Sequence, residues 1–234
     1  MKNATKNRAA NAYSTAARAL FLLFILALTG CALTRPTARP VVYDFGPGRL
    51  SSAPATSAGQ AAQATLAPLI LDEMQASNAL DSSAVLYRLA YVDAQQLRPY
   101  ALARWSMPPA QLVRQQLREQ LGQDRALLEP GAIFSLAKVL APGTATGVTP
   151  ITLRLELEEF SQLFEAPGSS VGLLRLRATL TQASPNGDGL LAQRSIVVQR
   201  PAPSADAAGG VQALKLATDA AAQELAQWLR QLGH

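Results

Sequence analysis

The chain has 234 residues, among them 21 Lys and Arg, 16 Asp and Glu, one His and one Cys. A single cysteine excludes an intrachain disulfide, and one histidine beside it cannot supply the three or four protein ligands of a zinc site. Residues 1–30 carry four cations and no acid, so without them the net charge falls from +5 to +1, which gives little support to a nucleic-acid partner.

Residues 1–30 have the order of an export signal, with cations first and then an uninterrupted apolar run over 19–28. This run would be roughly 15 Å long as a helix, whereas a bilayer core needs about 20 residues. Leu28-Thr29-Gly30-Cys31 follows and resembles the lipobox of bacterial lipoproteins, whose cysteine is acylated and becomes the first residue of the mature chain. We therefore predict a lipoprotein signal peptide over 1–30 and covalent lipid, palmitate included, on Cys31.

An ordinary secretory signal with a chance cysteine is the alternative for this segment. For a lipoprotein, the sorting rule that acts on the residue after the cysteine implies delivery to the outer membrane, because Ala32 stands where an aspartate would retain the protein in the inner membrane. The domain would then face the periplasm. Residues 31–40 contain Pro36 and Pro40 without apolar periodicity, which predicts an extended tether.

The segment 41–234 is predicted to form one domain that begins with strands. Val41–Phe45 is a short strand closed by Gly46-Pro47-Gly48, 50–64 is a flexible surface loop, and 66–71 is an apolar strand in which Pro68 indicates an edge or first-residue position. Residues 83–91 and 96–105 are two further strands, joined by a turn around Asp93.

A first helix is predicted after Ser106-Met107-Pro108-Pro109. Ser106 is the expected N-cap, and the prolines suit a first helical turn. Leu112, Val113, Leu117 and Leu121 recur at helical spacing, and Gly122 is the expected stop. A strand over 132–140 follows, ended by Pro142-Gly143.

The strongest alternation of apolar and polar residues runs over 151–160, and a second alternating segment follows over 171–181. Together they predict an antiparallel hairpin through Ala166-Pro167-Gly168. Its exposed face is expected to bring Arg175 and Arg177 near Glu156 and Glu158. A turn over 185–189 leads to a strand over 191–199, and 201–210 is a loop. A long amphipathic helix over 211–232 ends the chain, its apolar stripe formed by Val211, Leu214, Ala217, Ala221, Leu225, Trp228 and Leu232.

These elements predict an α+β fold, in which a mixed, mostly antiparallel sheet of six to eight strands packs one face against two amphipathic helices. No catalytic set accompanies this fold. Gly168-Ser169-Ser170-Val171-Gly172 has the spacing of a nucleophile elbow, but a strand follows where a helix is needed, and the sole histidine is His234. Glu156, Glu158 and Glu159 fit a solvated strand face, and no phosphate-binding or dinucleotide motif is present. We predict no enzyme, no metal and no cofactor beyond the lipid on Cys31.

Several residue groups behind the lipobox resemble the ABC-type transport auxiliary lipoproteins, the family of the paraquat-inducible protein C type, also called the cholesterol transport system auxiliary component. The resemblance covers roughly residues 40–232 and includes Tyr87-Arg88, Tyr100-Ala101 and the C-terminal helix. The residues that we carry over, in structural or docking roles, are Tyr43, Phe45, Gly46, Tyr100, Arg104, Trp105, Pro108 and Pro109. Taken alone, the Arg104-Trp105 pair has two interpretations, a binding pair or a core tryptophan, and the core is favoured.

The resemblance implies a non-enzymatic component of a lipid transport system. In such a system an inner-membrane ABC transporter works with a protein that carries an MCE domain, and an outer-membrane lipoprotein docks that component, with a ring-like homo-oligomer as one arrangement. Two alternatives stay open. One is a freestanding lipoprotein carrier or assembly factor that binds an acyl chain itself, and the other is a structural envelope lipoprotein.

Overall fold

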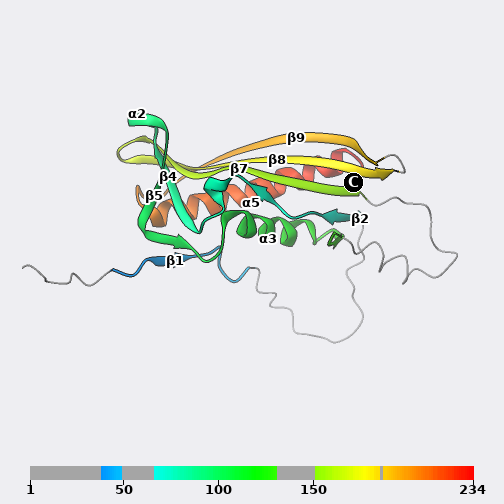
Figure 1. The fold of residues 1–234 in the computed structure, drawn as a ribbon, viewed down its shortest axis with the longest axis horizontal. Helices are drawn as coiled ribbons and strands as arrows, with labels where there is room; N and C mark the ends of the chain where they lie inside the picture. Colours follow the sequence, from blue (N-terminus) through cyan, green and yellow to red (C-terminus); the bar gives the residue numbers. More distant parts are fainter. Residues whose placement is uncertain (1–37, 49–65, 131–150, 185–186) are drawn as a thin grey trace, which may run out of the picture. The chain divides into compact units, whose positions relative to one another are not determined.

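The computed structural model describes residues 38–48, 66–130, 151–184 and 187–234. The contacts divide the chain after Arg39, and the second unit is the domain Pro40–His234. Its first half contains β1 (Val41–Tyr43), β2 (Leu66–Leu71), β3 (Gln75–Ala76), the 3₁₀ turn η2 (Asn78–Leu80), β4 (Ala84–Leu89), α2 (Ala90–Asp93), β5 (Ala94–Trp105), α3 (Pro109–Leu121) and β6 (Arg125–Leu128). Its second half contains β7 (Ile151–Ala166), β8 (Ser169–Ser184), β9 (Gly187–Pro201) and α5 (Ala207–Gln231) (Figure 1).

The described strands form one nine-stranded sheet organised around β7. Along one edge β7 pairs with antiparallel β8, which in turn pairs with antiparallel β9. Along the other edge three short strands follow one another, all parallel to β7: β2 beside 151–153, β3 beside 156–157 and β4 beside 162–164. β4 pairs with β5 in antiparallel orientation, and β5 pairs with β1 in parallel orientation. β2 also pairs with β6, in parallel orientation. β1 and β9 are therefore outer edges on opposite sides of β7.

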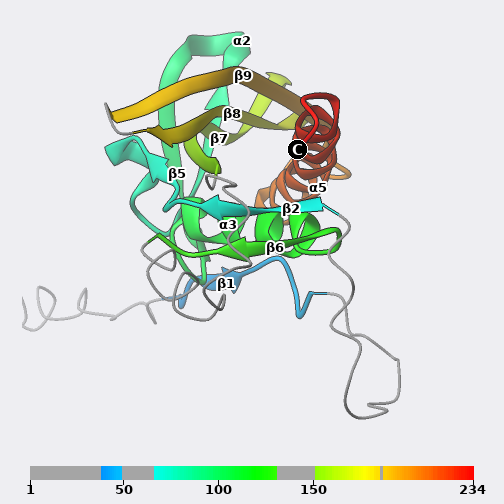
Figure 2. The same cartoon turned by 90° about the vertical axis from the view of Figure 1, so that its right-hand side faces the viewer.

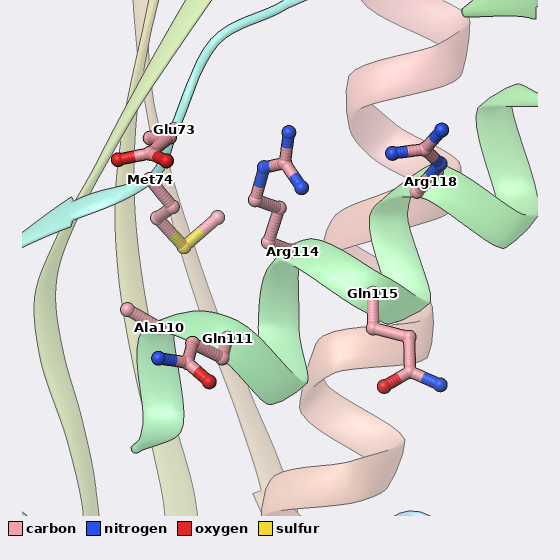
Figure 3. A pocket seen from close by; sticks show the side chains of 7 residues that line it. All are labelled: Glu73, Met74, Ala110, Gln111, Arg114, Gln115 and Arg118. Carbon is pink, nitrogen blue, oxygen red and sulfur yellow. The ribbon is translucent and has the colours of Figure 1, made fainter. Parts of the chain in front are cut away.

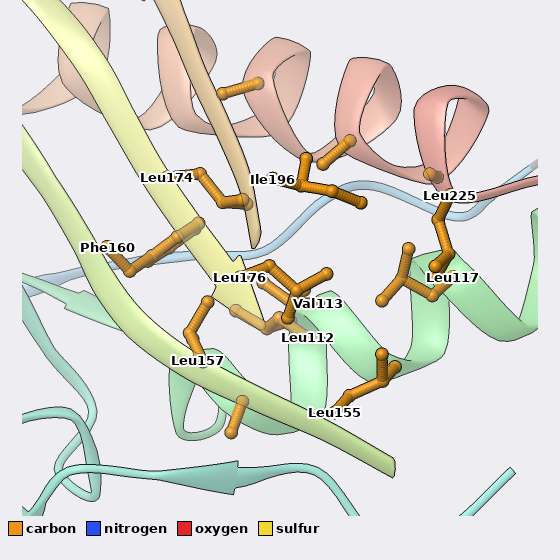
Figure 4. Close-up of a cluster of buried hydrophobic side chains, with 14 of the residues drawn as sticks. Leu112, Val113, Leu117, Leu155, Leu157, Phe160, Leu174, Leu176, Ile196 and Leu225 are labelled. Atoms are coloured by element: carbon orange, nitrogen blue, oxygen red, sulfur yellow. The ribbon is translucent and has the colours of Figure 1, made fainter. Parts of the chain in front are cut away.

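The long β7–β8 hairpin confirms the predicted alternation. Leu153, Leu155 and Leu157 of β7 are buried on one face, as are Leu174 and Leu176 of β8, and the turn falls at Pro167-Gly168. Helices α3 and α5 cover this buried face, and their apolar side chains meet those of the sheet in one core (Figures 2 and 4). The α+β class with helices on one face is thus as predicted.

The expected ion pairs across the hairpin form only in part. Arg177 forms an ion pair with Glu158, while Glu159 bonds Arg88 at 2.9 Å instead of its strand partner Arg175. A bulge between Leu157 and Glu159 shifts the register and turns Glu159 toward β4. The pairing of β7 with β4 is therefore reinforced by a part-buried salt bridge.

Helix α5 begins earlier than predicted, because 207–210 belong to its first turn and not to a loop. Asp206 is the N-cap: its Oδ1 accepts the Gly209 N–H at 2.8 Å, and this bond, followed by that from Ser204, lowers the pKa of Asp206. The predicted stripe is buried from Val211 to Trp228, but Leu232 lies beyond the helix and is exposed.

The start of α3 also differs from the prediction. Ser106 does not cap it: Pro108 is the N-cap, without a side-chain hydrogen bond, and the Ser106 N–H donates to the Tyr43 carbonyl at 2.7 Å. Gly122 ends α3 as expected. The turn at Asp93 is the short helix α2, and β6 was not predicted. The predicted loop over 50–64 and strand over 132–140 lie outside the described residues.

None of the described helices combines the length and the hydropathy that a membrane span requires.

We predict that Gly172→Ala destabilises the domain, because β8 and α5 approach each other closely at this glycine. A Cβ at Gly172 would lie 2.6 Å from the backbone atoms Ala213 C and Leu214 N, so the helix would have to move. Such overpacking costs about 1–3 kcal/mol of unfolding free energy, which urea denaturation measures. The matched control is Gly168→Ala in the same hairpin, where a Cβ meets nothing within 4 Å. Equal stabilities of the two variants would contradict the close approach.

Candidate docking site

Three aromatic rings join β1, β5 and β7 at the start of the domain. Trp105 is 2% exposed, and its ring centroid lies 5.8 Å from that of Phe45 and 5.6 Å from that of Phe160. The Phe45–Trp105 pair is edge-to-face, an arrangement worth about 0.5–1.5 kcal/mol beyond area burial. The sequence favoured a core role for Trp105 over a binding role, and Trp105 lies in the core.

The other residues carried over from the family pattern lie mostly around this cluster. Tyr43 pairs with Trp105 in the β1–β5 register and packs against the core. Gly46 has φ +83°, a conformation that favours glycine, and its N–H donates to Asp44 Oδ1 at 2.8 Å. Pro108 and Pro109 form the start of α3, where Pro109 is buried. Arg104 is exposed and forms no ion pair with any described residue.

Tyr100 lies apart from that cluster and begins a chain of polar side chains. Its ring packs at a tilt against that of Tyr87, with centroids 4.6 Å apart, and its hydroxyl donates to Gln162 Oε1 at 2.8 Å. The Gln162 amide then donates to Ser170 Oγ at 2.8 Å. Burial, more than the charge effects of Tyr87 and Asp206, raises the pKa of Tyr100, so its hydroxyl stays protonated and keeps donating. Gln162 is fully buried and was not among the residues expected from the sequence.

This chain explains the buried Ser170. It lies inside strand β8, 5% exposed and bonded to an amide, whereas a nucleophile elbow places its serine at a turn between strand and helix. The three acids considered on β7 are placed as well: Glu158 and Glu159 form ion pairs with Arg177 and Arg88, and Glu156 is exposed. Within the described ranges, no group of three or more His, Cys, Asp or Glu side chains is placed to hold a metal.

A groove of about 450 Å³ opens between the start of β3 and helix α3 (Figure 3). On the strand side it is lined by Glu73 and Met74. On the helix side the lining residues come from successive turns of α3: Ala110, Gln111, Arg114, Gln115 and Arg118. Charged and amide side chains therefore predominate, with one thioether between them, and this chemistry suits a polar protein segment better than an acyl chain.

The arginines of this groove are held in place by hydrogen bonds. Arg114 donates to the Leu71 and Asp72 carbonyls, both at 3.2 Å, and to Glu129 Oε2 at 2.8 Å. Arg118 bonds the other carboxylate oxygen of Glu129. The bonds from Arg118 and then Arg114 lower the pKa of Glu129, so this carboxylate stays ionised and keeps both guanidinium groups beside the groove.

Cys31, the predicted lipidation site, lies outside the described residues.

Comparison with known proteins identifies a family for this chain. Residues 49–226 match the model of the ABC-type transport auxiliary lipoprotein component. A crystal structure of a Xanthomonas campestris protein is 19% identical, with a TM-score of 0.57, and the match covers 74% of this chain and 90% of that one. A second crystal structure, of an uncharacterized protein, is 12% identical with a TM-score of 0.52 and covers 82% and 99%. Both likenesses concern the fold. No curated protein matches the chain.

We predict that Trp105→Ala lowers the unfolding free energy by about 3–5 kcal/mol, because it leaves a cavity beside Phe45 and Phe160. Its neighbour provides the control: Arg104→Ala should change stability by less than about 0.5 kcal/mol, since Arg104 is exposed and has no ion pair in the described residues. Chemical denaturation of both variants measures the difference. A large loss of unfolding free energy in the Arg104 variant would contradict the assignment of Arg104 to the surface and would show that both residues stabilise the core.

Proposed function

The chain belongs to the family of ABC-type transport auxiliary lipoprotein components, and from this premise we propose that it is the non-enzymatic outer-membrane member of an ABC and MCE-type lipid transport system. The family match over 49–226, behind a lipobox-like sequence that ends at Cys31, is the observation that carries the proposal. The domain would face the periplasm and dock the MCE-domain protein that works with the ABC transporter. The energy source would be the ATPase of that transporter.

The anchor in this proposal is lipid on Cys31. One acyl chain gives only marginal and reversible membrane binding, and stable anchoring needs two signals. Bacterial lipoprotein cysteines carry several chains, so the attachment would be lasting. Ala32 in the second position supports delivery to the outer membrane.

The groove beside α3 is the site we propose for docking the MCE-domain protein. Arg114 is fixed by two backbone carbonyls and by Glu129, so little side-chain entropy is lost when a partner covers it. Gln111 and Gln115 are exposed on the same helix and offer amide donors and acceptors. Preorganised polar groups around two apolar side chains, Met74 and Ala110, suit the edge of a protein interface.

The alternative of a freestanding acyl-chain carrier needs a deep apolar cavity. Four cavities in the described part of the domain do not favour such a carrier, because each of them has charged side chains in its lining. Lipid that co-purifies with the delipidated, monomeric domain would nevertheless support the carrier and count against the docking component.

For the anchor, we expect Cys31→Ala to leave the precursor uncleaved by the lipoprotein signal peptidase, because the acylated cysteine is what that enzyme recognises. Electrophoretic mobility and mass of the protein from membrane fractions measure this. The wild-type protein should carry a mass increase of covalent lipid at its new N-terminus. Normal maturation of the Cys31 variant would instead indicate an ordinary secretory signal.

For docking, we expect Gln111→Trp combined with Gln115→Trp to reduce capture of the MCE-domain protein about tenfold, equivalent to about 1.4 kcal/mol of interface energy, because the indoles fill the groove. Both positions are exposed, so the fold should persist. Gln199→Trp, exposed on β9, is the matched control and should bind as the wild type does. Equal capture by all three proteins would place the docking site elsewhere. Co-purification from membranes without any ABC or MCE component would contradict the docking role itself.

A further inference from the structure

Exposed apolar side chains gather where the domain begins, on the edge strand β1 and its neighbour β5. Val41 is 54% exposed, Val42 65% and Leu102 53%. The register pairs Val42 with Arg104, and Leu102 precedes Arg104 by two residues, so these three side chains share the face opposite to the buried Ala103 and Trp105. We call Val42, Leu102 and Arg104 the β1–β5 patch; Val41 pairs with Ala103 and lies on the other face of the sheet.

Single exposed apolar residues are common, but this patch is different in two respects. Its members are neighbours in one hydrogen-bonded ladder, so they present a continuous surface. They are also held in position, because Tyr43 and Phe45 pack into the core directly after them and the Tyr43 carbonyl accepts the Ser106 N–H. The patch is therefore a rigid apolar surface with one cation at its margin, Arg104, which forms no ion pair within the described part of the chain.

The position of the patch in the chain indicates what covers it. Ten peptide units separate Cys31 from Val41, and an extended chain of that length spans about 35 Å. In every anchored molecule, the patch can therefore reach the phospholipid surface that holds Cys31. Apolar side chains beside a cation match the boundary between acyl chains and anionic headgroups.

We propose that the β1–β5 patch is a second membrane contact, which lies against the phospholipid surface that holds the lipidated Cys31. This inference rests on the anchor of the proposed function. It adds that the domain has a fixed orientation on the membrane, with β1 toward the lipid and β9, on the opposite edge of the sheet, toward the aqueous phase.

The test places a fluorophore at two matched positions of the full mature protein. Acylation blocks the thiol of the sole native cysteine, so Val42→Cys and Val197→Cys each supply one labelling site; Val197 is a valine on β9 that is 54% exposed. Each protein carries an environment-sensitive dye and is reconstituted in vesicles of phosphatidylethanolamine and phosphatidylglycerol, 3:1, that contain lipid with a spin label near the headgroup. We expect loss of most of the fluorescence at position 42 and little change at position 197.

Arg104 provides an independent arm of the experiment. Raising the phosphatidylglycerol fraction should increase the quenching at position 42, and Arg104→Gln should reduce the affinity of the patch for these vesicles about fivefold, the effect of removing one cation near an anionic surface. Arg175→Gln on β8 is exposed and serves as the control. Identical behaviour of the two variants would remove Arg104 from the contact.

Two results would overturn the proposal. Equal quenching at positions 42 and 197 would show that the domain turns freely on its tether. Shielding at position 42 that requires the MCE-domain protein would make the patch a protein interface. The mass of the protein reports separately on the anchor. If the protein carries no lipid, a histidine tag in place of the acylated N-terminus attaches the domain to nickel-chelating vesicles of the same composition. The quenching at positions 42 and 197 is then compared on those vesicles.

Discussion

The packing of Trp105 between Phe45 and Phe160 fixes the start of the domain to its centre. β1 is three residues long and has β5 as its only described partner, so its backbone hydrogen bonds alone would hold it weakly. Phe45, two residues after β1, adds ring contacts to Trp105 and Phe160, and the Ser106 N–H donates to the Tyr43 carbonyl at the end of β1. Because the predicted tether joins the domain at β1, any force between the anchor and the core passes through this cluster.

The elements that could be predicted from the sequence are those in which one face is buried over several residues. The alternation in 151–157 and the stripes of α3 and α5 are of this kind, since burial itself selects the apolar positions. The bulge after Leu157 leaves no such pattern, yet it decides that Glu159 bonds Arg88 and not Arg175. The first turn of α5 contains Gly209 and Gly210, which are poor helix formers; a Cβ at either would collide with Ser204 or Gln162, so packing and not propensity explains them.

The candidate site shows the same division. Sequence order was enough to group Tyr43, Phe45 and Trp105 and to favour the core for Trp105, but burial was needed to show that Trp105 is enclosed while its neighbour Arg104 is exposed. Gln162 was missed because a polar residue in an apolar strand has two explanations, a solvent-facing position or a buried hydrogen-bond partner, and the partners Tyr100 and Ser170 come from β5 and β8. The α3 groove was beyond prediction for a related reason: Arg114 and Arg118 fit an ordinary solvated helix face until Glu129 and the end of β2 are placed beside them.

A lipid anchor restricts how far a domain can move, but it does not restrict how the domain is turned. With about 35 Å of tether, the α3 groove would sample all directions. Binding of a partner would then include the loss of rotational entropy of the domain, which weakens the affinity. The second contact proposed at the β1–β5 patch would remove that rotation before the partner binds. The same strand would then receive the tether, touch the membrane and be fixed to the core by Phe45, so the orientation of the groove would follow from the packing of Trp105.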